Sequence, residues 1–255
     1  MWSTSRLSCL ALSVVITIVP TTTYGQDRPS RTLFDRLPGD VAPAVAALGR
    51  RVERPGSEQT VYNGLFMNSS GNRSDARFIH QLPGLVRLEG FLPGNQSVSF
   101  DGNRVFGLSG RTPEMLLETF VNDTAEGMLS SVKQGAASRL IGRGFKPNAR
   151  ADPNTTGSGY DIYEIVSPVQ GFPLPGDQLK RYYFDTKTGL LLSTRYIDHR
   201  TSPAISVETR FSNWTSQDGP SYPQRVDRYE DGQLIFSFIV LSVISGPSLD
   251  SSSFR

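Results

Sequence analysis

The chain has 255 residues and a formal net charge of +2, from 26 basic and 24 acidic side chains. Nucleic-acid-binding domains usually carry a clear excess of basic side chains on one face, so this near balance argues against a nucleic-acid partner. The 24 glycines and 17 prolines stand mostly between apolar runs, which is typical of a β-rich protein with many turns. The length is sufficient for one sizeable hydrophobic core.

The N-terminal segment has the pattern of a cleavable export signal. In the segment that ends at Gly25, Arg6 is the only charged residue, an apolar run covers residues 7–20, and Thr23 is small. A basic, an apolar and a small-residue region in this order are typical of a signal peptide. The apolar run is shorter than the roughly 20 residues of a membrane span, so an N-terminal anchor is the weaker interpretation. We therefore expect residues 1–25 to be a signal peptide and the mature protein to work in the periplasm, with secretion as the alternative.

Catalytic chemistry has little support in the sequence. The single cysteine, Cys9, lies in the expected signal, so the mature chain should have no thiol, no disulfide and no cysteine metal site. His80 and His199 are far apart and belong to no short-spaced metal motif such as H-E-x-x-H. A G-x-S-x-G nucleophile elbow is absent as well. We expect a non-catalytic protein without metal or cofactor; an exported enzyme would need the two histidines, or converging carboxylates, to meet in one cleft.

The mature chain is predicted to begin with a flexible lead and a short helix. Residues 26–39 are polar and contain prolines, which suits a flexible segment. Across residues 41–52 apolar side chains recur at helical spacing, and Asp40 stands in the N-cap position. We interpret residues 40–255 as one domain, because neither side of the Asn-, Asp- and Gly-rich stretch 147–159 looks self-sufficient.

A series of short strands is predicted next. Apolar runs alternate with segments rich in Asn, Gly, Asp and Pro, and the Asp-Gly-Asn stretch 101–103 suits a hairpin turn. The short gaps favour antiparallel pairing, because a parallel crossover needs a dozen or more residues. The strands predicted in this part are Thr60–Asn68, Asp75–Leu82, Leu85–Leu92, Gln96–Phe100 and Arg104–Leu108.

The best-defined helix is predicted over Thr112–Gln134. Thr112 can cap it, and Pro113 takes the first helical position, which proline favours. Apolar residues recur at spacings of three and four from Leu116 to Val132, and they give the helix one continuous apolar face.

The strands then resume and continue almost to the end of the chain. Within Ala204–Asn213, Ile205, Val207 and Phe211 fall on one face and polar residues on the other, which predicts a strand with one wet face. The strands predicted after the helix are Arg139–Phe145, Tyr160–Val166, Gln178–Phe184, Leu190–Ile197, Ala204–Asn213, Tyr222–Tyr229 and Leu234–Val243.

Several of these turn-and-strand segments resemble a known family. Tyr182–Leu191 resembles its "yFDpkTGLL" hairpin, Asp218–Pro223 is similar to "dGv.fP", and Leu249–Phe254 is similar to "ld.s.F". Upstream, Leu82–Arg87 and Phe100–Gly102 resemble the matching elements of the first half. Their order is similar to that of bacterial LolA/LolB-like outer-membrane lipoprotein-sorting proteins, in a divergent branch of that family. The resemblance covers most of the mature chain.

The resemblance implies a mainly β fold of the α+β type. The family fold is a single antiparallel, strongly curved and unclosed β-barrel covered by two or more helices, with an apolar cavity between them for acyl chains. The family's functional arginine matches no particular arginine of this chain, so none is carried over. The chain also lacks a convincing lipobox, so it resembles a soluble periplasmic carrier more than a membrane-anchored acceptor.

Two functional hypotheses follow. The first is a periplasmic carrier of lipids or lipoprotein acyl chains, whose burial contributes about 0.8 kcal/mol per CH₂ without any catalytic group. The second is an RseB-like sensor or protein-interaction module of the same fold. The expected partners are a lipid or an acylated lipoprotein, and an envelope protein, with the chain acting as a monomer. The residues expected to line the cavity, each with ordinary core packing as the alternative, are Val86, Leu88, Phe100, Leu116, Phe120, Ile205, Val207 and Phe211.

Overall fold

The computed structural model describes most of the chain after residue 58. The described residues are 59–81, 85–91, 96–101, 104–107, 110–133, 136–145, 159–168, 177–215 and 221–254. The expected signal peptide, the flexible lead and the short helix predicted over residues 41–52 lie outside the described residues.

The described strands form one sheet of twelve strands in the order β5-β4-β3-β2-β1-β12-β11-β10-β9-β8-β7-β6. Every predicted strand is present, and the observed ends lie within a few residues of the predicted ones. The strands are β1 (Gln59–Asn68), β2 (Arg73–Gln81), β3 (Leu85–Glu89), β4 (Ser97–Phe100), β5 (Val105–Gly107), β6 (Ala137–Phe145), β7 (Gly159–Pro168), β8 (Asp177–Asp185), β9 (Leu191–Asp198), β10 (Ile205–Thr215), β11 (Tyr222–Glu230) and β12 (Gln233–Gly246).

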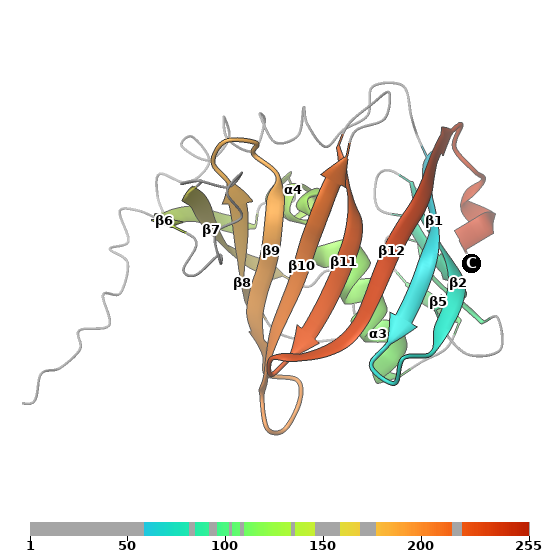
Figure 1. Cartoon of the computed structure of the whole chain (residues 1–255), viewed down its shortest axis with the longest axis horizontal. Coiled ribbons are helices and arrows are strands. Elements are labelled where there is room, and N and C mark those ends of the chain that lie inside the picture. Colours follow the sequence, from blue (N-terminus) through green and yellow to red (C-terminus); the bar gives the residue numbers. More distant parts are fainter. Residues whose placement is uncertain are drawn as a thin grey trace, which may run out of the picture.

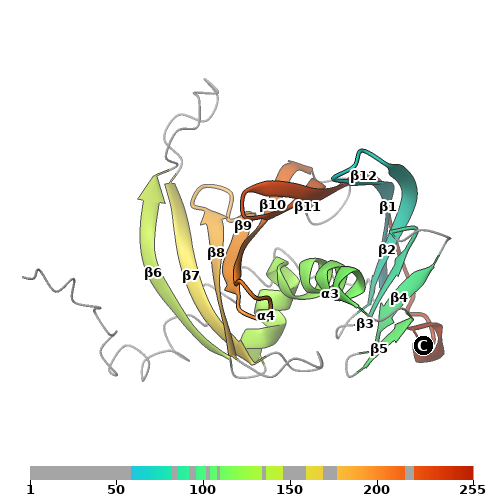
Figure 2. The same ribbon diagram turned by 90° about the horizontal axis from the view of Figure 1, so that it is seen from below.

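The sheet consists of two antiparallel meanders that meet in its middle. β1 to β5 run outward to one edge, the chain then crosses as a helical segment to the other edge, and β6 to β12 return until β12 pairs with β1. Figure 2 shows the sheet bent into a trough, with the helical segment lying along its concave face. The edge strands β5 and β6 stay apart, so the barrel is not closed. The predicted unclosed antiparallel fold is confirmed.

The helical segment differs from the single helix predicted over Thr112–Gln134. It consists of α3 (Arg111–Leu117), a π-helical turn η2 (Glu118–Asn122) and α4 (Ala125–Lys133). At the π turn, the Asp123 amide donates to the carbonyl of Glu118, five residues back, at 3.0 Å. Thr124 then begins α4 anew, because its Oγ1 accepts a hydrogen bond from the Gly127 amide at 3.0 Å as an N-cap.

The core lies between the concave face and the helical segment, and its centre is aromatic. The ring of Phe120, in the π turn, lies 5.0 Å from Phe78 of β2 and 5.6 Å from Phe238 of β12, centroid to centroid. Phe91 and Phe236 belong to the same cluster. Tilted and edge-on aromatic pairs of this kind add stabilisation beyond the apolar area that they bury.

A second, smaller cluster lies on the outer face of β1 and β2. The short helix η3 (Ser251–Phe254) packs there and buries Phe254 against Val61 and Ile79. The amide group of Gln81 bonds both the carbonyl oxygen of Leu249, at 3.0 Å, and its backbone nitrogen, at 2.7 Å. These contacts hold the C-terminal residues against the sheet (Figure 1).

Candidate functional site

An apolar pocket opens between the concave face and the helical segment, near the end of β10 and the start of β11. Its cavity has a volume of about 70 Å³. The walls are formed by Tyr62, Phe78, His80, Phe120, Thr124, Ala125, Glu126, Leu191, Phe211, Trp214, Ser221, Tyr222, Pro223, Val226, Phe238 and Val240.

Among the described residues of this wall, Glu126 is the one acidic side chain, and the other polar groups that line it are uncharged. Burial lowers the pKa of His80, against the attraction of Glu126, so the imidazole is neutral at neutral pH. The indole nitrogen of Trp214 donates to the backbone carbonyl of Leu191 at 3.1 Å. The indole therefore has its hydrogen bond satisfied while its ring lines the pocket. Such a wall suits an apolar ligand better than a charged one.

The residues predicted to line the cavity lie at different places on the concave side. Phe120 and Phe211 are in the pocket wall. Val86, Leu88, Phe100 and Leu116 are buried in the same core but away from that wall. Val207 is buried on the concave face, and Ile205, two residues earlier, is only half-buried. Contact of these eight residues with a ligand stays a prediction.

Much of the pocket wall was not predicted from the sequence. Tyr222 and Val226, both on β11, contribute to it together with Trp214 and Leu191. Tyr222 and Val226 stand four residues apart, and residues at even spacing share one face of a strand. The alternation in β11 therefore carried a usable signal. Trp214 and Leu191 lie near strand ends, where sequence patterns do not determine which face a side chain takes.

Next to the pocket, the concave side contains a buried cluster of charged residues that the sequence did not predict. Glu118 and Asp123 lie at the two ends of the π turn and are completely buried. Lys180 of β8 and Arg228 of β11 approach them from the sheet, and both are only 1% exposed. The four formal charges cancel, as buried charges require.

Lys180 lies at the centre of this cluster. Its Nζ forms an ion pair with Glu118 and another with Asp123 Oδ1, at 2.6 Å. Asp123 Oδ2 accepts a hydrogen bond from Thr209 Oγ1 at 2.7 Å, and the backbone carbonyl of Asp123 accepts one from Thr194 Oγ1 at 2.6 Å. The end of the π turn is thereby bonded to β8, β9 and β10 at once.

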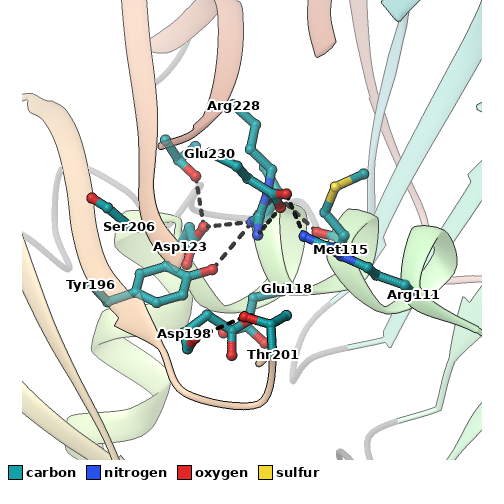
Figure 3. Close-up of polar contacts among 12 residues, drawn as sticks. Arg111, Met115, Glu118, Asp123, Tyr196, Asp198, Thr201, Ser206, Arg228 and Glu230 are labelled. Atoms are coloured by element: carbon teal, nitrogen blue, oxygen red, sulfur yellow. Dashed lines mark hydrogen bonds and ion pairs between the residues drawn. The ribbon is translucent and has the colours of Figure 1, made fainter. Parts of the chain in front are cut away.

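Arg228 extends the network toward α3, as Figure 3 shows. Its guanidinium lies 3.6 Å from Asp123 Oδ2 and donates to Tyr196 Oη and Glu230 Oε1, each at 3.2 Å. Glu230 in turn pairs with Arg111, the first residue of α3, at 2.6 Å. The charged cluster therefore fastens α3 as well as the π turn to the sheet.

The electrostatics of the cluster indicate a structural role. Burial alone would lower the pKa of Lys180, but Asp123 and Glu118 outweigh it and raise the pKa well above its ordinary value. Burial would raise the pKa of Glu118, but Lys180, Arg200 and Arg228 together hold that pKa below its ordinary value. For Asp123 burial dominates, and the pKa is raised. At neutral pH Lys180 and Glu118 therefore stay ionised, and the pair holds the π turn, which carries Phe120 of the pocket wall, against β8.

The two histidines do not come together. His80 lines the pocket, whereas His199 is exposed just after β9. Among the described residues, no group of three or more His, Cys, Asp or Glu side chains is arranged to hold a metal ion. Within the same residues, no helix has the length and apolar character needed to cross a membrane.

Comparisons with known proteins find similarity in structure and not in sequence. No protein-family signature matches the chain, and no curated protein matches its sequence. A LolA superfamily protein of Nitrosomonas europaea superposes with a TM-score of 0.53 at 9% identity, over 84% of this chain and 97% of its own. A domain named for outer membrane lipoprotein sorting, from Vibrio parahaemolyticus, superposes with a TM-score of 0.51 at 8% identity, over 85% of this chain and 95% of its own. The resemblance seen in the sequence is thus confirmed at the level of the fold, which is LolA-like.

Proposed function

We propose that this chain is a non-catalytic carrier that binds lipids, or the acyl chains of lipoproteins, in the pocket under its helical segment. The observation that carries the proposal is the pocket wall, in which aromatic and aliphatic side chains from β1, β2, β9, β10, β11 and β12 face the helical segment. Each CH₂ group buried there contributes about 0.8 kcal/mol. Binding of this kind requires no catalytic group.

The size of the cavity sets a condition on this proposal. A volume of about 70 Å³ is too small for a whole acyl chain, so side chains of the wall must move before one can bind. A long chain therefore enters by displacing side chains of the wall, among which Trp214 is half-buried. The fluorescence emission of Trp214 should therefore change when a ligand enters.

The proposed location is the bacterial periplasm. Two observations support it: the signal-like N-terminal 25 residues, and a structural relative that is named for outer membrane lipoprotein sorting. A carrier in this compartment would move acyl chains through water between two membranes. An apolar pocket suits this task because it removes the acyl chain from water.

The test is a fluorescence titration with a fatty acid or lysophospholipid. Trp2 and Trp214 are the two tryptophans, so Trp2→Phe makes Trp214 the sole reporter whether or not the signal is removed. We expect a saturable emission change in this background, and weakening by at least about tenfold when Val226→Phe fills the pocket. Val166→Phe, the same change on a half-buried position of β7 outside the pocket wall, is the matched control and should bind like the parent. Absence of saturable binding, together with no lipid extracted from the purified native protein, would overturn the proposal.

The second candidate is the RseB-like sensor or protein-interaction module. Leu241 and Ile244 of β12 favour it, because both are large aliphatic side chains left exposed on a strand in the middle of the sheet. A native preparation that carries a fixed protein partner and no lipid would decide for this candidate.

A further inference from the structure

The outer, convex face of the sheet carries two clusters in which two arginines share one glutamate. In the first, Glu164 of β7 accepts hydrogen bonds from Arg139 of β6, at 2.7 Å, and from Arg181 of β8, at 3.0 Å. In the second, Glu208 of β10 accepts from Arg195 of β9 at 2.9 Å and from Arg210 at 2.7 Å. In the second cluster the two arginines exceed the one glutamate by one charge.

The positive charge of these clusters faces the solvent. Glu164 is only 3% exposed, whereas the side chains of Arg181 and Arg195 are 51% and 53% exposed. The glutamates lie beneath the arginines and neutralise them only in part. An approaching molecule meets guanidinium groups, which suit phosphate and carboxylate oxygens by their planar, forked donors.

The register brings the two clusters together. Arg181 lies directly opposite Arg195 on the neighbouring strand, so two like charges stand side by side, each paired with its own glutamate. Leu179 and Ile197 stand two residues from these arginines and therefore on the same face, and they are 45% and 46% exposed. Figure 1 shows β8 and β9 side by side, with the helices behind the sheet. The result is a patch in which two arginines on neighbouring strands lie beside two exposed aliphatic side chains.

We propose that this patch, formed by Leu179, Arg181, Arg195 and Ile197, docks the protein onto an anionic lipid bilayer. The two arginines bind phosphate groups of the lipid heads, and the two aliphatic side chains enter the interface between heads and chains. The patch lies on the face of the sheet opposite the pocket, so this docking is independent of the cargo. Arginines alone would also suit an acidic protein; the exposed aliphatic pair beside them is what favours the bilayer.

The test is cosedimentation with vesicles of phosphatidylcholine, with and without phosphatidylglycerol. We expect binding to the anionic vesicles only, weakening as salt screens the charges. The double variant Arg181→Gln with Arg195→Gln should bind about 30-fold more weakly. The control is Arg73→Gln with Arg104→Gln, which removes the same charge at two exposed arginines outside the patch and should bind like the parent. Leu179→Ser with Ile197→Ser should also weaken binding, although it changes no charge.

Two outcomes would overturn the docking proposal. The first is that the parent does not bind anionic vesicles, which would point to an acidic protein partner. The second is that the control variant loses as much vesicle binding as Arg181→Gln with Arg195→Gln. Thermal unfolding of each variant shows whether it is folded before binding is compared. The Trp214 titration reports the pocket separately, so failure of membrane docking and failure of cargo binding are distinguishable.

Discussion

At the scale of single residues, Lys180 shows how a charge is kept inside a protein. Its ammonium group replaces lost water with ion pairs to Glu118 and Asp123. Removing one partner of such a group leaves the others buried and unpaired, which costs more than the group itself contributes.

Lys180→Met should therefore lower the free energy of unfolding by about 3–5 kcal/mol, because two buried carboxylates lose the counter-ion that lies closest to them. Urea denaturation followed by circular dichroism measures the change. Lys187→Met, at an exposed position of the β8–β9 turn, is the control and should change the stability by no more than about 0.5 kcal/mol. Equal stability of the two variants would contradict the role given to Lys180.

Glu118 makes stability depend on pH. Its pKa is lower in the folded protein than its ordinary value, so its contribution is complete above about pH 4.3 and is lost as the pH falls toward the folded pKa. We expect the unfolding free energy to fall with pH in this acidic window, and to fall less steeply in Glu118→Gln. Urea denaturation at a series of acidic pH values measures both slopes, with Glu114→Gln on α3 as the control. Parallel slopes in the parent and Glu118→Gln would be evidence against this account.

At the scale of elements, the interruption of the helical segment depends on one glycine. A Cβ at Gly127 would lie 2.0 Å from the carbonyl oxygen of Val121, so the turn from η2 into α4 leaves no room for a side chain. The glycine lets the chain re-enter a helix directly after Asp123 has turned inward.

Gly127→Ala should destabilise the protein by about 1–3 kcal/mol, because backbone must shift to admit the methyl group. It should also change Trp214 emission in the Trp2→Phe background, since Ala125 and Glu126 of the same turn line the pocket. Gly142→Ala is the matched control, because a Cβ there meets nothing within 4 Å. A variant at Gly127 with unchanged stability and emission would show that the turn is not fixed as described.

The strands could be predicted from the sequence because their signals are local. Alternation in Ile205–Phe211 and turn residues such as Asp231 and Gly232 depend on neighbours in the chain. The π turn could not be predicted, because its cause is distant. Glu118 and Asp123 turn inward toward Lys180 and Arg228, which lie more than fifty positions later in the chain. Most of the pocket wall escaped prediction for the same reason, since six strands and the helical segment must first be assembled.

At the scale of the whole molecule, one sheet offers two chemically different faces. The concave face is apolar around Phe120 and closes over ion pairs that are shielded from water. The convex face carries half-exposed arginines over glutamates that are less exposed than they are. Because successive residues of a strand point to opposite sides, substitutions in the patch and in the pocket should act independently of each other.

The central pairing of β1 with β12 has a consequence for how the chain folds during its synthesis. Gln59 pairs with Gly246, so the seam in the middle of the sheet joins strands from opposite ends of the described chain. Native structure with such distant partners forms slowly, since the ends must meet before the contact stabilises anything. Until the last strand has left the ribosome, β1 presents an open edge on which a foreign strand can pair. A truncation that removes β12 would therefore leave two half-sheets linked only by the helical segment. A chaperone that occupies the open edge of β1 would protect the incomplete chain from pairing with a foreign strand.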